Sequence, residues 1–545
     1  MLSFVGTRPY LPSVVDISPL NYEKFAHELQ NHPNRQWVDF ILHGIRNGFH
    51  LGFNSSIKLK SSNRNKPSAY QHAQVVDAYL DKEVRLGRVA GPFDSPPISP
   101  LQVSSFGVIP KKGQPNKWRL IFDLSSPFGH SVNDGIDSDE YSLQYIRVDD
   151  IVRMSARLGR GAMLAKFDIE SAYRNVPVHP SDRHLLGMRW KSKYFVDLVL
   201  PFGLRSAPFI FNSIANAVEW ILQSNYGIDD ILHYLDDFVL AGPPNSNSCA
   251  NKLAIATFET AQLGLPLHPD KCVGPATCLV ILGIEIDTMA ETLRLPADKF
   301  AATLQLLRAW SSFKWCRKKQ LQSLIGVLHH ACKVVWPGRT FMRRMINLLR
   351  CFRKDDHPIR LNEEFKRDLN WWLDFFSQWN GISFFLLPHL LPPPTVYVGS
   401  DASGTRGYGA YLNSDWFNGR WSPKQTFLSI AYKELFPVVV AAHVWGHCWR
   451  RHRILFRVDN EAVVAILNSR TSRDPHIMVL LRSLLFAAAR FGFTFSAEHV
   501  AGVRNGIADA LSRFHMQVFR SLAPNANRYP TAIPAQLLSS LTWDL

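Results

Sequence analysis

Cysteine is scarce in this chain of 545 residues, and its seven cysteines include no CxxC pair. An odd number of scattered cysteines argues against a disulfide scaffold and a zinc ribbon, and it favours a reducing compartment. Long apolar runs are also lacking, since stretches such as Leu435 to Trp445 are too short to span a bilayer. The start MLSFVGTRPYLP has no charged segment followed by an apolar run, so we expect no signal peptide. An intracellular protein, in cytoplasm or nucleus and without a membrane partner, is the expectation.

Acidic residues are outnumbered, with 45 Asp and Glu against 61 Lys and Arg, which gives a formal net charge of +16. Such a surplus suits a polyanionic partner, nucleic acid first and an acidic membrane surface second. A basic protein without such a partner is the alternative. The 46% hydrophobic content, with 15 Trp, 35 Phe and 15 Tyr, argues against disorder. The length suits about three or four domains, and no solenoid-type repeat is present.

The chain changes character along its length. Residues 1–95 are mixed, with helical spacing at 37–45 and 71–86 and a basic stretch at 58–66 that suits a loop or exposed strand. Short strands and turns follow, and then a mostly helical region over 296–380. Pro392 to Pro394 indicate an extended linker. A second alternation of strands and helices comes after the prolines, and the tail beyond about 520 is expected to be loose.

The region after residue 100 contains several short apolar segments. Residues 105–110 and 118–124 flank a basic turn and predict a hairpin. Met163 to Asp168 predicts a buried strand followed by a helix from Ser171, and residues 231–239 predict a strand, a turn and a strand. Residues 279–286 are expected to form one strand.

Acidic residues stand at the ends of these apolar segments. Asp236 and Asp237 adjoin inside Tyr234-Leu235-Asp236-Asp237, where their repulsion and desolvation are costly unless a cation offsets them. Asp168 ends the earlier strand. Transfer of a phosphoryl group to a 3′-hydroxyl uses two divalent cations about 3.5–4 Å apart, held by carboxylates. The alternatives are an exposed β-turn for the Asp pair and a helix N-cap for Asp168.

The wording around these acids resembles that of reverse transcriptases. LAKFDIESAYRNVPVHP is similar to their motif A, YLDD to motif C, and LPFG followed by SAP to motif B. The resemblance implies that an aromatic residue excludes the 2′-hydroxyl of a ribonucleotide and that a glycine lets the backbone approach nucleotide and template. It assigns the metal ligands Asp168, Asp236 and Asp237, the steric gate Tyr173, and the substrate contacts Phe202 and Gly203.

Basic residues complete this resemblance. IPKKGQPNKWRLIFDL looks like the fingers hairpin of the family, in which Lys112 and Arg119 match the residues that grip the triphosphate of the incoming nucleotide. Lys271, in LPLHPDKC, resembles the motif D lysine, a candidate to protonate the leaving pyrophosphate. A solvated basic turn and an ordinary loop lysine are the alternatives.

A second set of acids follows the prolines. Asp401 and Asp459 end strands, whereas Glu434 and Asp509 lie near the starts of helices. Caps and strand-end turns would explain each residue alone, but the set suggests two hard cations. SDASGTRGYGAYL, AYKEL, RVDNEAVV and HVAGVRNGIADALSR resemble the motifs of RNase H, in which His499 matches a mobile histidine that assists water activation or product release.

The resemblance implies an α+β fold: a right-hand polymerase with fingers, palm and thumb, a connection, and an α/β RNase H-like domain. The expected domains are an N-terminal extension of unknown role (1–95), fingers and palm (96–290), thumb and connection (291–390), the RNase H-like domain (395–515) and a tail (516–545).

The implied protein is a retrotransposon reverse transcriptase with two Mg²⁺ or Mn²⁺ ions in each active site. Its expected partners are an RNA template, a DNA primer, an RNA/DNA hybrid and dNTPs. The wording is closest to DIRS-type elements, and an LTR-type element is the alternative. A catalytically inactive, nucleic-acid-binding relic and a template-directed RNA polymerase are the competing interpretations. Tyr173 and the RNase H-like half argue against the RNA polymerase.

Overall fold

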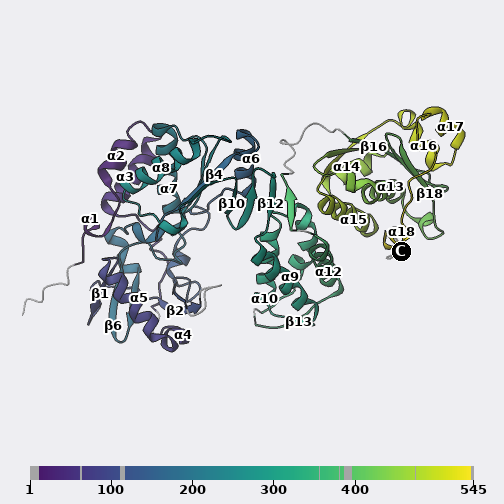
Figure 1. The fold of residues 1–545 in the computed structure, drawn as a ribbon. Coiled ribbons are helices and arrows are strands. Elements are labelled where there is room, and N and C mark those ends of the chain that lie inside the picture. Colours follow the sequence, from purple (N-terminus) through teal and green to yellow (C-terminus); the bar gives the residue numbers. More distant parts are fainter. Residues whose placement is uncertain are drawn as a thin grey trace, which may run out of the picture. The chain divides into compact units, whose positions relative to one another are not determined.

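The computed structural model describes residues 11–61, 64–110, 117–354, 356–379, 381–385, 396–472 and 474–541. The chain forms two compact units, Met1–Thr277 and Cys278–Leu545, and each is described by itself (Figure 1). Among the helices of the described ranges, none is both long and apolar enough for a membrane span.

The first unit is built around an antiparallel four-stranded sheet. Apolar residues fill most of its buried positions, among them Phe167 and Phe238, whose rings stack with centroids 4.8 Å apart. Helices α7 (Ala207–Tyr226) and α8 (Ser248–Gln262) pack on this sheet (Figure 1). The strands, in spatial order, are β7 (Ile231–Tyr234), β8 (Asp237–Gly242), β4 (Met163–Asp168) and β9 (Val273–Ala276).

The basic hairpin predicted near residue 110 is present as β2 (Ser105–Pro110) and β3 (Trp118–Asp123), paired antiparallel. A separate three-stranded sheet places β6 (Lys193–Asp197) between β1 (Val89–Phe93) and β5 (Gly187–Trp190). The expected helix from Ser171 is wrong. Only a 3₁₀ turn forms over Ala172–Asn175, because Ser171 and Ala172 have φ of 62° and 27°, which no α-helix contains.

The N-terminal residues pack into the first unit. Helices α3 (Arg35–Asn47) and α5 (Ala73–Arg85) confirm the two helical patterns, and α2 (Tyr22–Glu28) and α4 (Pro67–Gln71) accompany them. Phe25 and Ile41 are fully buried in the core that also contains the sheet. The N–H of Asn21 donates to the carbonyl of Leu263 at 3.0 Å. These residues are therefore part of the first unit's core.

The second unit begins with an antiparallel sheet of β10 (Cys278–Ile281), β11 (Ile284–Asp287), β12 (Thr292–Arg294) and β15 (Ile382–Phe384). The single strand expected over 279–286 is wrong. Leu282 and Gly283, with φ of 48° and 76°, form a two-residue turn that folds the segment into a hairpin.

The helical region that follows matches the prediction. Its main helices are α9 (Ala297–Ser311), α10 (Lys318–Ala331), α11 (Arg343–Leu349) and α12 (Glu363–Gln378). Phe365, Leu369, Trp372 and Phe376 recur at helical spacing and bury one face of α12.

A five-stranded mixed sheet forms the C-terminal part. Strand β16 pairs antiparallel with β17 and parallel with β19, which in turn pairs parallel with β20. The elements are β16 (Val396–Ala402), β17 (Gly407–Leu412), β18 (Asp415–Arg420), α13 (Ile430–Trp445), β19 (Arg453–Val458), α14 (Glu461–Ser469), α15 (Pro475–Phe491), β20 (Thr494–His499) and α16 (Gly506–Ser512). This is the α/β domain that the sequence predicted.

The tail is ordered, contrary to the prediction. Helices α17 (Met516–Leu522) and α18 (Ala535–Leu541) form, and the Trp416 indole donates to the carbonyl of Asn527 at 2.7 Å. The N–H of Thr531 donates back to the carbonyl of Trp416. A buried indole N–H needs an acceptor, and the tail supplies it.

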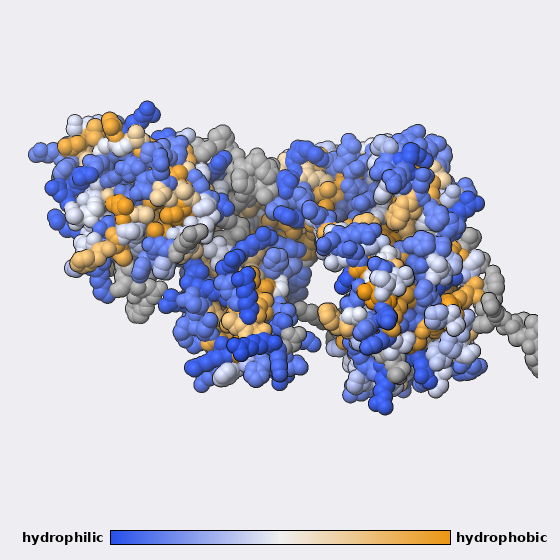
Figure 2. Space-filling view, turned by 180° about the vertical axis from the view of Figure 1, so that it is seen from behind, coloured by the Kyte–Doolittle hydropathy of each residue, from blue (hydrophilic) through white to orange (hydrophobic). Residues whose placement is uncertain are grey.

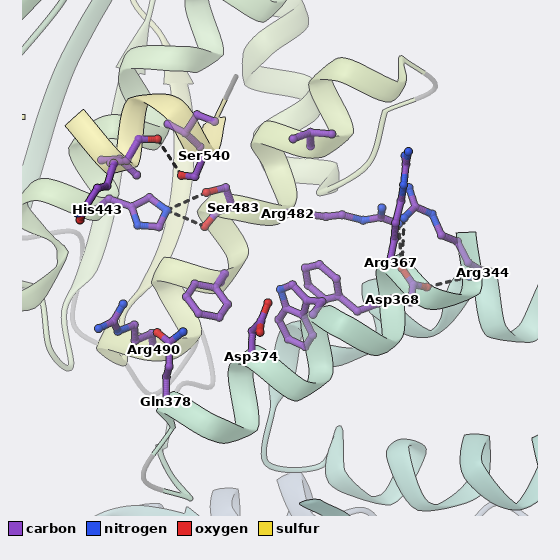
Figure 3. Close-up of a pocket in the computed structure, with 17 residues that line it drawn as sticks. Arg344, Arg367, Asp368, Asp374, Gln378, His443, Arg482, Ser483, Arg490 and Ser540 are labelled. Atoms are coloured by element: carbon purple, nitrogen blue, oxygen red, sulfur yellow. Dashed lines mark hydrogen bonds and ion pairs between the residues drawn. The ribbon is translucent and has the colours of Figure 1, made fainter. Parts of the chain in front are cut away.

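A cavity of about 610 Å³ lies between α12, α15 and α18 (Figure 3). Figure 3 shows Arg344, Arg367 and Arg482 around Asp368, whose side chain is 1% exposed. Arg344 donates its backbone N–H to Asp368 at 3.1 Å, and the Arg482 guanidinium lies 3.5 Å away. Burial raises the pKa of Asp368 to about 6, although both arginines lower it. This buried ion cluster joins α12 to α15.

The molecular surface is mostly polar. On the face drawn in Figure 2, hydrophilic residues predominate and hydrophobic ones form small, separate groups. Among the residues coloured on that face there is therefore no broad apolar surface.

Candidate active sites

Two strands of the first unit bring the first set of acids together. Asp168, the last residue of β4, lies directly opposite Asp237, the first residue of β8. Leu235, with φ of 55°, and Asp236 form the tight turn between β7 and β8. The N–H of Ile169 donates to the carbonyl of Asp236 at 3.1 Å, which ties the turn to the end of β4. Asp168 is thus brought to the same end of the sheet as Asp236 and Asp237, which are far from it in sequence.

At this end of the sheet, burial and mutual repulsion disfavour the ionised carboxylates when no cation is bound. Asp168 is only 4% exposed. Burial, the charges of Asp236 and Asp168, and a hydrogen bond with Asp168 raise the pKa of Asp237 to about 6. Burial and the charge of Asp168 also raise the pKa of Asp236. Groups that resist ionisation in this way are typical of sites where a bound cation offsets the repulsion.

Lys271 is the nearest positive charge. Its Nζ lies 2.8 Å from Oδ2 of Asp168. Burial lowers the pKa of Lys271, but its bond to Asp168 and the three carboxylates raise it above the ordinary value. The sequence singled out this lysine, and the structure brings it into direct contact with the acids.

Tyr173 lies beside the same acids. Its ring centroid is 5.3 Å from that of Phe202 and 5.6 Å from that of Phe211. Burial, with the nearby Asp236 charge among the smaller causes, raises the pKa of the Tyr173 hydroxyl. Phe202 is 52% exposed, so its ring faces solvent next to the tyrosine. Tyr173 and Phe202 therefore form an aromatic pair, and the charge of Asp236 acts on its tyrosine.

Gly203 follows in a conformation that requires glycine. Its φ is +99°, and a Cβ there would lie 2.7 Å from the carbonyl oxygen of Phe122. The buried Asn133 amide donates to the Gly203 carbonyl at 2.8 Å and accepts from the N–H of Arg205 at 2.8 Å. Sequence analysis missed Asn133, because no local pattern sets one asparagine apart from others.

The basic hairpin is described in part. Arg119 is exposed on β3, where it pairs in register with Ile109. Lys112 lies outside the described residues. Tyr145, which sequence analysis also missed, stacks on Tyr234 with ring centroids 4.7 Å apart.

The second set of acids converges in the second unit. Asp401 lies near the end of β16, Glu434 in the first turns of α13, and Asp459 directly after β19. One carboxylate oxygen of each lies within 4.8 Å of the others. Asp509, in α16, raises the pKa of Asp401 through its charge and bonds Arg513 at 2.6 Å. Three of the predicted acids therefore lie together, and the charge of the fourth, Asp509, acts on one of them.

These acids fit a cation site. Asp401 and Glu434 are 4% and 5% exposed, and Oε2 of Glu434 is buried without a hydrogen-bond partner. Burial and the charges of Asp401 and Asp459 raise the pKa of Glu434 to about 9, and burial first of all raises that of Asp401 to about 6. A buried carboxylate oxygen without a donor is the kind of ligand that a hard cation takes.

Neighbouring polar groups fix this cluster. Ser512 donates its hydroxyl to Asp401, and the buried Asn505 amide donates to the carbonyl of Ser400 at 2.9 Å. These contacts anchor α16 on β16, and only the folded chain reveals them. His499 is exposed at the end of β20, with Nε2 3.2 Å from the carbonyl oxygen of Asp459.

The raised carboxyl pKa values predict an unusual pH dependence. Without metal, a carboxyl group whose pKa is higher in the folded than in the unfolded protein stabilises the fold fully at pH values below its unfolded pKa. This stabilisation is lost as the pH rises through the pKa of the folded protein. Thermal stability in a chelator should therefore fall from about pH 4 to pH 9. Asp401 contributes first, together with Asp197, Asp237 and Asp368, whose pKa values are also raised to about 6, and Glu434 contributes later. Added Mg²⁺ should reverse the fall, because cations need the ionised ligands.

Thermal unfolding across this pH range, with and without Mg²⁺, measures the effect. A Glu434→Gln variant should flatten the upper half of the metal-free curve. Wild-type stability that rises with pH in the chelator would contradict the assignment of these shifts.

Comparison with known proteins identifies the class. Residues 109–286 match the family described as "Reverse transcriptase (RNA-dependent DNA polymerase)". The chain therefore contains a reverse transcriptase domain, and it is homologous to retrotransposon and viral polyproteins, as its motifs predicted.

Two relatives illustrate this homology. Polyprotein P3 of Commelina yellow mottle virus is 24% identical over 74% of this chain and 20% of that protein. The Transposon Tf2-3 polyprotein of Schizosaccharomyces pombe is 22% identical over 67% of this chain and 26% of that protein. The chain thus spans about a fifth to a quarter of these relatives' length.

The solved structures to which the chain is similar include the foamy viral protease-reverse transcriptase in two complexes. The complex with dsDNA has 15% identity and a TM-score of 0.47, covering 88% of this chain and 98% of that chain. The complex with RNA/DNA hybrid has 13% identity and a TM-score of 0.46, covering 88% and 63%.

Proposed function

We propose that this chain is an active reverse transcriptase with ribonuclease H activity. It copies RNA and DNA templates into DNA and cleaves the RNA strand of RNA/DNA hybrids. The observation that carries the proposal is the pair of separate acid clusters, Asp168 with Asp236 and Asp237 in one unit and Asp401, Glu434, Asp459 and Asp509 in the other. We also propose the domain limits that the sequence suggested, with fingers and palm over 96–290 and the RNase H-like domain over 395–515.

Both clusters would hold divalent cations, Mg²⁺ or Mn²⁺. When bound, such ions activate the attacking oxygen and stabilise the charge that develops on the phosphate. The chain's own residues bind and orient the substrates. In the first unit, Lys271 adjoins the acids and can deliver a proton to the leaving pyrophosphate. Arg119 and Lys112 would hold the triphosphate, as guanidinium and ammonium groups do.

In the second unit, the exposed imidazole of His499 lies at the backbone of Asp459, within reach of the water or the product at that acid. Arg513 bonds Asp509, whose charge acts on Asp401, and so restrains that carboxylate. The net charge of +16 suits binding of template, primer and hybrid.

A paired assay tests the proposal. Purified chain is given poly(rA)/oligo(dT) and dNTPs, first with Mg²⁺ and then with Mn²⁺, and separately a hybrid labelled on its RNA strand. We expect metal-dependent primer extension and RNA cleavage. Binding of both substrates with neither reaction, in either metal, would favour the inactive nucleic-acid-binding relic.

Replacing Tyr173 by Ala should relax the choice of sugar. The Tyr173 ring packs beside that of Phe202, and the charge of Asp236 acts on its hydroxyl. Loss of the Tyr173 ring would open space for a 2′-hydroxyl. Ribonucleotide incorporation relative to deoxynucleotide incorporation should rise on the order of tenfold to a hundredfold. Single-nucleotide extension with competing rNTP and dNTP measures the ratio. Tyr173→Phe keeps the ring and should keep the selectivity, so equal ratios for the Ala and Phe variants would refute the gate.

A further inference from the structure

Two histidines and an aspartate form a third cluster of potential ligands, outside the strand ends that carry the first acid cluster and outside the second unit. They are His50, His179 and Asp182, and one ligand atom of each lies within 4.8 Å of the others. Among the described residues, only this group and the Asp401 group bring three potential ligand atoms together so closely. Unlike the Asp401 group, it contains imidazole nitrogen.

The backbone holds the two histidines in place. Phe49 and Val178, the buried residues just before them, form a parallel bridge. The N–H of Phe49 donates to the carbonyl of Pro177 at 2.9 Å, and the N–H of His179 donates to the carbonyl of Phe49 at 3.0 Å. Gly48 permits this approach, because a Cβ there would lie 2.5 Å from the backbone nitrogen of His179. These backbone bonds therefore hold the two imidazoles side by side, with ring centroids 4.0 Å apart.

Asp182 and Ser181 orient both rings. Oδ2 of Asp182 accepts the N–H of Leu51 at 2.8 Å and lies 3.3 Å from Nδ1 of His50. The Ser181 hydroxyl lies 2.7 Å from Nδ1 of His179 and donates to Oδ1 of Asp182 at 2.7 Å. The hydrogen bonds of both rings thus run through Nδ1. Because Oδ2 of Asp182 lies at Nδ1 of His50, an ion bound to this carboxylate would take Nδ1 and not the nitrogen on the far side of the ring. Nδ1 of His179, which accepts the N–H of Ser181 at 3.3 Å, is the corresponding atom of the second ring.

We propose that His50, His179 and Asp182 bind a transition-metal ion of the Zn²⁺ class. Two imidazole nitrogens and a carboxylate oxygen suit Zn²⁺ far better than Mg²⁺ or Ca²⁺, which prefer oxygen. The cluster lies at the surface, with the His50 side chain 56% exposed, so an ion can reach it from solvent. His43, on α3, places its ring nearly parallel to that of His179 with centroids 6.4 Å apart, so a further imidazole lies near the cluster.

Zinc binding to the full-length chain without a histidine tag tests the site. A chromophoric chelator competes for Zn²⁺ while excess Mg²⁺ fills the acid clusters. The wild type should retain one Zn²⁺ per chain, and His50→Gln, His179→Gln and Asp182→Asn should each weaken it by more than about tenfold. His27→Gln, at an exposed histidine of α2, is the matched control and should bind as the wild type does.

A second readout separates binding from folding. Zn²⁺ should raise the thermal stability of the wild type and of His27→Gln in a concentration-dependent way, and it should not raise that of His179→Gln. Co²⁺ bound in place of Zn²⁺ should show the absorption of a nitrogen-ligated ion. The proposal fails if the wild type retains no Zn²⁺ in excess Mg²⁺, or if the three cluster variants retain it as tightly as the control does.

Discussion

The Asp168→Asn variant should lose DNA synthesis by at least about a thousandfold while it still cleaves RNA in a hybrid. Asn matches Asp in size, so the end of β4 should keep its fold. However, a neutral amide removes the negative charge that faces Asp237 and the oxygen that Lys271 bonds at 2.8 Å. The variant would therefore lose one cation ligand and leave the lysine without its partner.

Primer extension under single-turnover conditions measures the loss, and hybrid cleavage by the same preparation shows that the second unit is intact. Asp229→Asn is the matched control, because Asp229 is exposed in the loop just before β7. It should extend primers at the wild-type rate. Extension by Asp168→Asn at a rate near that of the control would remove Asp168 from the site.

Much of the first acid cluster could be predicted because its signals are local. The apolar segment that ends in Asp168 and the two apolar runs that meet at Asp236 and Asp237 each reveal a strand and its end. The register that sets Asp168 opposite Asp237 was not predicted, and the structure supplies it.

The secondary structure predicted from the sequence was wrong where the backbone conformation differs from the one that the side-chain pattern indicates. Residues 279–286 form a nearly continuous apolar run like that of one strand, yet left-handed conformations at Leu282 and Gly283 divide them into a hairpin. A similar conformation at Ser171 prevents the expected helix. Hydropathy does not report the sign of φ, and only the glycine among these residues hinted at it.

Contacts between distant residues could not be predicted at all. Asn133 supports the Gly203 turn from 70 residues away, and the tail satisfies the Trp416 indole from 111 residues away. Asn505 and Ser512 lie within a motif that the sequence did single out, but their bonds to β16 depend on the folded sheet. Such polar partners are set by tertiary packing, for which a single sequence carries no periodic signal.

The Asp401→Asn variant should show the opposite separation of activities: loss of RNA cleavage by at least about a thousandfold, with DNA synthesis unchanged. Asp401 is buried next to Glu434 and Asp459, and burial first, then the repulsion of neighbouring carboxylates, raises the pKa values of Asp401 and Glu434. Removing one charge relieves that repulsion, so the same variant should melt at a higher temperature than the wild type in a chelator.

The two effects together distinguish a cation site from a structural acid cluster. If Asp401 served only the fold, its replacement would lower stability, since the bond that Ser512 donates to it would weaken. If Asp401 holds a cation, the variant gains metal-free stability and loses the extra stability that Mg²⁺ gives the wild type. Glu461→Gln, at an exposed acid of α14 in the same domain, should change neither quantity. A variant that still cleaves hybrid RNA and still gains stability from Mg²⁺ would exclude Asp401 as a ligand, and with it the nuclease half of the proposal.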